Sequence, residues 1–266
     1  MTTETQLKGS HMESIKRSKF NVKSIYIPKI LTHFELVGIF HDVFGHPLRK
    51  ELYTTCFEQD QKMLDLRISV IKEENKEFKD ALEAKNLVEM ADALCDLAYF
   101  IYGAGHCLGV NLDELIKIFK INISTPTDLT FNDQNILDNK SEFIKINHKL
   151  IEDDIEHFCK DIEKKNFIKI IIHLVHMLDH TYTLGHGLGF NMDLMFREVH
   201  RSNMTKVCLT VIDAETSVEL YLKEGRYKEP SIKTKDQYFI VYDKTNNKIL
   251  KNYKWEMPNL KQFMQL

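Results

Sequence analysis

The sequence lacks two features that would each point to a particular class of protein. Its longest apolar runs fall short of the roughly 18 residues that a membrane-spanning helix needs. It also lacks a basic excess, because 36 Lys and Arg against 39 Asp and Glu give a formal net charge of −3. This balance gives no reason to expect binding to nucleic acid or to a membrane, so we expect neither partner.

Cysteine is scarce, and its placement predicts no cross-link. The five cysteines are odd in number, scattered, and form no Cys-x-x-Cys pair: Cys56, Cys95, Cys107, Cys159 and Cys208. Such usage indicates reduced thiols rather than a disulfide framework or a zinc knuckle. We therefore expect a cytoplasmic protein.

The chain is otherwise ordinary in size and composition. Its 266 residues, 43% of them hydrophobic and 28% charged, suffice for one large domain or two small ones with a real core. Near the start, "GSHM" (9–12) is typical of an expression-vector remnant. We expect residues 1–11 to be tag residues and the native chain to begin at Met12.

An internal repeat organises the middle of the chain. "GHCLGVNLDEL" (105–115) recurs as "GHGLGFNMDLM" (185–195), an offset of 80 residues. The same offset holds without a gap back to Ile71, which matches Ile151. Agreement at one fixed offset over this length indicates a tandem duplication.

Each copy is predicted to contain two long helices. In the first copy, apolar residues near helical spacing predict a helix over about 62–83 and another over about 87–106, linked near Lys85. "GHCLG" ends the second helix, since glycine can adopt the left-handed stop conformation, and Asn111 or Asp113 suits the cap of a further helix. A short link makes the long helices antiparallel neighbours, so two copies predict an all-α bundle with an internal pseudo-twofold axis.

The segments outside the repeats differ in character from them. Residues 122–140 are a polar, Asn/Asp/Thr-rich connector. After Val207, "QYFIVYDKTNNKILKNYKW" alternates around a turn at Asn246-Asn247 and predicts a small β-hairpin, which we expect to be an accessory. The expected divisions are an N-terminal arm (12–60), repeat 1 (61–121), a linker (122–140), repeat 2 (141–207) and a C-terminal tail (208–266).

Carboxylates recur along one stripe of each long helix in the first copy. Glu74 and Glu77 are three residues apart and share a face, with Glu73 beside them. On the next helix Asp92 and Asp96 lie within "MADALCDLAYFIY", among residues typical of a protein core. Because a buried, unpaired carboxylate is strongly unfavourable, these two aspartates need a compensating partner.

Facing carboxylates of this kind are ligands for a hard divalent cation, Mg²⁺ or alternatively Mn²⁺. Such ions bind substrate phosphates, so the pattern points towards phosphoanhydride chemistry. For the glutamates alone, a solvated face paired with neighbouring lysines is an equal alternative. That alternative does not explain Asp92 and Asp96.

The acidic pattern carries a family resemblance. "EENKE", the Asp-bearing helix after it and the "GVNLDE" turn resemble the all-α nucleoside triphosphate pyrophosphohydrolases, which include the MazG-like, dimeric dUTPase-like and phosphoribosyl-ATP pyrophosphohydrolase-like proteins. Their pattern is Glu-Glu-x-x-Glu followed by Glu-x-x-Asp on the next helix. Asp96 fits the final Asp, but the Glu would fall at Ala93. Either Asp92 stands in for it, or Glu89-x-x-Asp92 is the register.

Two further stretches resemble the phosphoribosyl-ATP branch. They are "FHDVFGHPLR" (40–49) and "REVHRSNMTK" (197–206), the latter followed by "GRYKEP" (225–230). The resemblance covers most of residues 35–230 and implies hydrolysis of a nucleoside triphosphate to the monophosphate and pyrophosphate with Mg²⁺. The metal ligands would be Glu74, Glu77, Asp92 and Asp96, with Glu73 or Glu77 orienting the attacking water.

The offset alignment separates the two copies by chemistry. Opposite Glu74 and Asp96 the second copy has Asp154 and His176, and imidazole suits softer metals than Mg²⁺. The basic element "RSNMTK" lies only in the second copy. We therefore predict one composite site per chain, in which acids of the first copy hold the metal and the second copy grips the phosphates through Arg201, Asn203 and Lys206. The alternative is that this element only places cations at a helix end.

Three assignments stay open at the level of sequence. Asp154, His157, His173 and His176 occupy the four positions of the acidic pattern in the second copy; they either bind a transition metal such as zinc or are the remains of a decayed site. The aromatic and histidine residues of "FHDVFGHP" either hold the base or belong to the core. The candidates for the base are Phe40, His41 and Phe44. "GRYKEP" either covers the phosphates or marks a turn.

The predicted function is Mg²⁺-dependent nucleotide pyrophosphohydrolysis by a pseudo-dimer within one chain, two of which could pair further as a homodimer. A catalytically silent nucleotide-binding or regulatory module is one alternative, and intact Glu74, Glu77 and Asp96 argue against it. A purely structural bundle is another, which stabilisation by Mg²⁺ would exclude.

Overall fold

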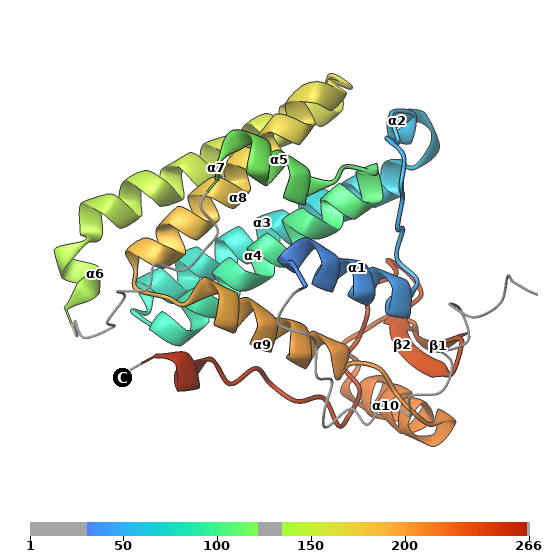
Figure 1. Cartoon of the computed structure of the whole chain (residues 1–266). Helices are drawn as coiled ribbons and strands as arrows, with labels where there is room; N and C mark the ends of the chain where they lie inside the picture. Colours follow the sequence, from blue (N-terminus) through green and yellow to red (C-terminus); the bar gives the residue numbers. More distant parts are fainter. Residues whose placement is uncertain (1–30, 122–134, 265–266) are drawn as a thin grey trace, which may run out of the picture. The chain divides into compact units, whose positions relative to one another are not determined.

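The structure, a computed structural model, describes residues 31–121 and 135–264, which fall within one structural unit (Figure 1). The predicted tag residues, the first part of the N-terminal arm and most of the linker lie outside the described residues. As predicted, the described residues are mostly helical, with a two-stranded antiparallel sheet near the C-terminus. The helices are α1 (His33–Phe44), α2 (Cys56–Gln59), α3 (Gln61–Glu83), α4 (Leu87–Leu108), α5 (Leu112–Phe119), α6 (Ile136–Asn139), α7 (Ser141–Glu163), α8 (Phe167–Gly187), α9 (Met192–Met204), α10 (Val211–Glu224) and the 3-10 helix η2 (Leu260–Phe263).

α3 and α4 form the antiparallel hairpin that the sequence predicts. Lys85 turns the chain with a positive φ of 52°, and the side chain of Asn86 accepts hydrogen bonds from the first backbone N–H groups of α4. α4 packs against α1, α3, α8 and α9 and is therefore apolar on almost every side. This central position explains why Asp92 and Asp96 are embedded in a core-like sequence.

A glycine ends α4 for two reasons. Gly109 adopts the left-handed conformation, with φ 69°. A Cβ atom at this position would also lie 1.8 Å from the backbone oxygen of Glu51, so no other residue fits without moving the chain. Asn111 then caps α5 by accepting from the backbone N–H of Glu114, which decides between the two predicted caps.

α7 and α8 repeat this hairpin with matching bounds. The first residue of α7 lies 80 residues after the first residue of α3, and α8 begins 80 residues after α4. Lys165 and Gly189 repeat the positive φ angles of the first hairpin, at 54° and 82°. These bounds support the tandem duplication, which itself stays a prediction.

Two equivalent residues of the copies meet where α4 packs on α8. The hydroxyl oxygens of Tyr102 and Tyr182, both fully buried, lie 3.4 Å apart. Contact between a residue and its own counterpart is what a twofold axis produces. The contact is therefore consistent with the predicted pseudo-twofold relation.

The C-terminal hairpin forms, but with different strands from those predicted. β1 (Pro230–Lys235) pairs with β2 (Tyr238–Asp243), and the turn between them contains Asp236 at φ 51°. The predicted turn at Asn246-Asn247 exists, yet the chain beyond it pairs with β2 only through an isolated bridge. The hairpin packs with α10 around a small core of Cys208, Ala214, Val241 and Leu250.

Among the described helices, none is by itself long and apolar enough to cross a membrane. Only α4 and α5 taken together meet that length and composition, and the chain bends by 112° between them.

Candidate functional site

A cavity of about 320 Å³ lies among α1, α3, α4, the end of α9 and the C-terminal segment. It collects residues that are far apart in the sequence but were predicted to act together. Five carboxylates from two helices line it: Glu73, Glu74, Glu77, Asp92 and Asp96.

α3 presents Glu74 to this cavity from its buried face. Leu64, Ile71 and Phe78 lie on the same face, and Glu74 is only 7% exposed. Its Oε2 atom is buried and accepts no hydrogen bond from a described residue. Buried polar atoms without partners are rare in folded proteins, so this oxygen indicates a ligand.

α4 supplies the two aspartates. Asp92 and Asp96 lie one helical turn apart and both line the cavity. The Oδ1 atom of Asp92 is buried and, like Glu74 Oε2, has no hydrogen-bond partner among the described residues. The predicted convergence of acids from two antiparallel helices is therefore present in the structure.

Burial and mutual repulsion disfavour the ionised form of these acids. Burial is the larger cause and repulsion by the neighbouring carboxylates the smaller; together they raise the pKa of Glu74 to about 10 and that of Asp92 to about 8. The pKa values of Glu77 and Asp96 are raised in the same direction, again mainly by burial. The protein alone does not supply enough positive charge to keep the cluster ionised.

Orphaned buried oxygens and clustered carboxyl groups with raised pKa fit a hard divalent cation. Carboxylate oxygens are the ligands that Mg²⁺ and Mn²⁺ prefer. Glu74, Glu77, Asp92 and Asp96 would hold such an ion.

The pH dependence of stability should reveal this cation. Glu74 and Asp92 have ordinary pKa values of 4.5 and 3.8, which describe the unfolded chain. Because their folded-state pKa values are raised, they keep their protons where the unfolded chain has lost them. Without a cation, the contribution of these two acids to the free energy of unfolding is therefore largest below about pH 4 and falls as the pH rises towards their folded-state pKa values.

Mg²⁺ should weaken this fall, because a bound cation favours the ionised acids. Thermal unfolding at about pH 5 and about pH 8, in chelator and in millimolar Mg²⁺, tests it, with Asp92→Asn as the comparison variant. We expect Mg²⁺ to stabilise the wild type more at the higher pH and the variant much less. An equal Mg²⁺ effect at both pH values would contradict this prediction.

The last turn of α9 and the residues after it bring a cation to the acids. The Nζ atom of Lys206 lies 2.6 Å from Oδ1 of Asn203, and the Asn203 side chain also hydrogen-bonds Asp96. Burial lowers the pKa of Lys206, while Asp96 acts in the opposite direction. Asn203 thus links the basic element of the second copy to the acidic cluster of the first.

The structure places Arg201 outside this cavity. Its guanidinium donates to both carboxylate oxygens of Glu198 at 2.9 Å and also pairs with Glu256 at 2.7 Å. The ion pair with Glu256 attaches the last turn of α9 to the C-terminal segment. Arg201 is therefore not brought together with Asn203 and Lys206, contrary to the predicted phosphate-binding set.

Of the three residues predicted to bind the base, the structure places two in the cavity and one outside it. Phe40 and His41 line the cavity. Phe44 is fully buried, its ring 4.3 Å from that of Phe40, and it does not line the cavity. His41 is also buried, and its Nδ1 atom lies 2.7 Å from the backbone oxygen of Pro47, so its ring is held in place.

The aromatic part of the cavity also includes His46, a histidine of "FHDVFGHP", and Tyr99, which the sequence did not single out. The ring of Phe40 stacks on His46 at 5.7 Å and meets Tyr99 edge-on at 5.5 Å. Burial, with repulsion from nearby cations, lowers the pKa of His46 to about 3, so this ring is neutral. Such neutral, aromatic surfaces suit stacking of a nucleobase.

Arg67 is a cavity residue that sequence reasoning missed. It is 5% exposed, and its Nε atom is buried without a hydrogen-bond partner among the described residues. The sequence does carry a signal for this residue. Arg67 interrupts the apolar stripe of α3 between Leu64 and Ile71, and Glu74 interrupts the same stripe between Ile71 and Phe78.

The C-terminal tail forms part of the cavity wall and is not an accessory. Arg226 and Tyr227 of "GRYKEP" line the cavity, as do Lys248 and Lys251. The Nζ atom of Lys248 also pairs with Oε1 of Glu73, at 3.1 Å. This segment therefore brings further cations to the acids.

The comparisons with known proteins agree with the acidic half of this site. Residues 37–121 match the phosphoribosyl-ATP pyrophosphohydrolase family, which confirms the predicted resemblance over the segment that holds all five carboxylates. The match indicates a pyrophosphohydrolase-type activity. An uncharacterized protein of Acanthamoeba polyphaga mimivirus is 29% identical over 241 residues, covering 88% of this chain and 96% of that protein. No solved structure shows significant similarity to the chain.

Proposed function

We propose that this chain is a divalent-metal-dependent pyrophosphohydrolase that converts a nucleoside triphosphate, ribo or deoxy, to the monophosphate and pyrophosphate. The observation that carries the proposal is the convergence of five carboxylates from α3 and α4 with the amine of Lys206 in one cavity. Acids to hold a cation and a cation to hold phosphate are the two parts that this reaction needs.

The four carboxylates named above would hold Mg²⁺, or Mn²⁺ in its place. When bound, the ion supplies Lewis-acid charge to phosphate oxygens and to the attacking water. The chain must also supply a base. Glu73 is engaged by Lys248, whereas Glu77 has a raised pKa and makes no ion pair with a described residue. Glu77 is therefore the better placed of the two predicted residues to accept the proton of the water.

The bond changes follow from this placement. The water oxygen attacks a phosphorus of the α–β bridge, its proton passes to Glu77, and the bridging P–O bond breaks to release pyrophosphate. Lys206 is held by Asn203 close to the acids and would carry part of the charge that develops on the leaving group. Arg67, Arg226 and Lys251 line the same cavity and would bind the remaining phosphate charge.

The substrate would lie with its phosphates at the charged part of the cavity and its base at the aromatic part. Phe40 and Tyr99 offer ring surfaces there, together with the neutral His46. Stacking tolerates different bases, so these rings provide affinity without fixing one base. We expect the choice of base to depend on polar groups close to them.

Pyrophosphate release from a panel of ribo-, deoxy- and modified nucleoside triphosphates, with Mg²⁺ or Mn²⁺, tests the proposal. We expect pyrophosphate and monophosphate in equal amounts from at least one substrate and none in chelator. Release of orthophosphate with a diphosphate would overturn the proposed bond cleavage. No turnover, with nucleotides still raising the Tm, would identify a catalytically silent nucleotide-binding module instead.

A further inference from the structure

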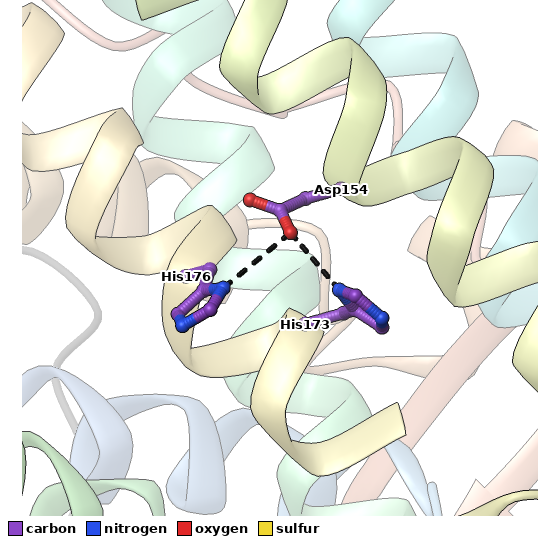
Figure 2. Close-up of side chains that lie close together, drawn as sticks. All are labelled: Asp154, His173 and His176. Atoms are coloured by element: carbon purple, nitrogen blue, oxygen red, sulfur yellow. Dashed lines mark hydrogen bonds and ion pairs between the residues drawn. The ribbon is translucent and has the colours of Figure 1, made fainter. Parts of the chain in front are cut away.

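The second copy carries a separate cluster where α7 faces α8 (Figure 2). Asp154 comes from α7, and His173 and His176 come from α8, one helical turn apart. A candidate ligand atom from each of the three lies within 4.8 Å of the others. At the 80-residue offset Asp154 and His176 lie opposite Glu74 and Asp96 of the first copy, so an imidazole replaces one of those two carboxylates, whereas His173 lies opposite Ala93.

The carboxylate of Asp154 is the centre of this cluster. Its Oδ1 atom lies 2.9 Å from Nδ1 of His173 and 3.6 Å from Nδ1 of His176, as Figure 2 shows. Its other oxygen lies 3.5 Å from Nε2 of His180, one turn further along α8. Three histidines at positions i, i+3 and i+7 of α8 therefore face one carboxylate of α7.

A second carboxylate fixes the orientation of one of these imidazoles. Nε2 of His173 lies 3.2 Å from Oδ2 of Asp161, which is buried at 6% exposure. A histidine whose second ring nitrogen donates to a carboxylate is the usual arrangement around a protein-bound metal, because it sets the tautomer and leaves the other nitrogen as a ligand.

We propose that Asp154, His173, His176 and His180 bind one zinc ion that joins α7 to α8, with Asp161 orienting His173. Three imidazole nitrogens and one carboxylate oxygen suit Zn²⁺, and four protein ligands are typical of a structural site. Mg²⁺ prefers a set dominated by oxygen, so the two clusters differ in their choice of metal. The proposed ligand set therefore differs from the one predicted from the sequence, because it contains His180 in place of His157. His157 is exposed, and its ring stacks on that of His173 with the centroids 5.5 Å apart.

Isothermal titration calorimetry of zinc binding to the full chain, in excess Mg²⁺, tests this proposal. In this experiment Mg²⁺ is present to fill the carboxylate cavity of the proposed active site, and Asp96→Asn serves as a second check that zinc is not binding there. We expect one zinc ion per chain, a higher Tm with zinc, and Co²⁺ absorption bands typical of four-coordinate nitrogen and oxygen ligands.

Variants identify the ligands. The side chain of His176 is 51% exposed, so His176→Ala should fold, and we expect it to bind zinc at least about 100-fold more weakly. Asp161→Asn should weaken binding by roughly 10- to 100-fold through the orientation of His173. The matched control is His157→Ala, an exposed histidine of the same face that should bind zinc as the wild type does.

Two outcomes would overturn the proposal. One is the absence of zinc binding to the wild type. The other is equal zinc affinity in the wild type, His176→Ala and His180→Ala, because zinc would then bind elsewhere. In either case the cluster would be a set of hydrogen-bonded histidines around a buried carboxylate.

Discussion

Asp96→Asn should abolish pyrophosphate release, with kcat at least about 10³-fold lower, which corresponds to about 4 kcal/mol of transition-state stabilisation. Asp96 contributes to both parts of the proposed site, the metal ligands and the phosphate-binding cation. It lines the acidic cavity, and it hydrogen-bonds Asn203, the partner of Lys206. Asparagine has nearly the same shape but lacks the charge that a divalent cation needs. Steady-state kinetics with the best substrate of the panel measures the loss.

A stability measurement on the same variant separates loss of function from loss of folding. Removing this charge reduces the repulsion felt by Glu74 but also removes the attraction between Asp96 and Lys206, so we expect Asp96→Asn to stay folded with a Tm close to that of the wild type when no divalent cation is present. The matched control is Glu89→Gln. It makes the same kind of change at an exposed position of α4 outside the cavity and should keep kcat within about threefold. Full activity in Asp96→Asn would remove this carboxylate from the mechanism.

Lys206→Met should lower kcat/KM by roughly 10²- to 10³-fold, the usual effect of removing one group that stabilises developing charge. The Lys206 amine lines the same cavity as the carboxylates and is oriented by Asn203. Methionine keeps most of the length of the side chain but not its charge, so the change tests charge rather than packing.

Arg201→Met is the control for Lys206→Met, because the sequence assigns both residues to phosphate binding and the structure separates them. The Arg201 guanidinium is occupied by Glu198 and Glu256 outside the cavity. We expect kcat/KM to stay within about threefold and the free energy of unfolding to fall by about 1 kcal/mol, as for partly exposed ion pairs. Equal kinetic losses in the two variants would show that both cations reach the substrate.

The two helical hairpins carry different candidate metal sites. In the first copy, buried acids without hydrogen-bond partners are unfavourable in the absence of a cation and are the basis of the proposed activity. In the second copy, imidazoles of α8, among them His176 opposite Asp96, form the proposed zinc site with Asp154 and would stabilise the hairpin of α7 and α8. A zinc-dependent Tm alongside Mg²⁺-dependent turnover would show that the two roles have separated.

The sequence by itself determined the helices and the faces that they present. Periodicity and caps located α3 and α4 to within two residues, since helix period and terminal chemistry are local properties. The three- and four-residue spacings placed Glu74 with Glu77 and Asp92 with Asp96, and all four meet in one cavity. The fixed offset of 80 residues located the second cluster before any contact was known.

Only the tertiary structure decided which residues of distant segments meet. Arg201 lies in the last turn of α9 and Lys206 lies just beyond the end of that helix, so their common motif could not show which one faces the acids. The tail enters the cavity wall because α10 and the hairpin share a small core, which no local pattern records. His180 rather than His157 faces Asp154 for the same reason: spacing fixes the face of one helix, whereas the packing of two helices fixes which residues lie opposite each other.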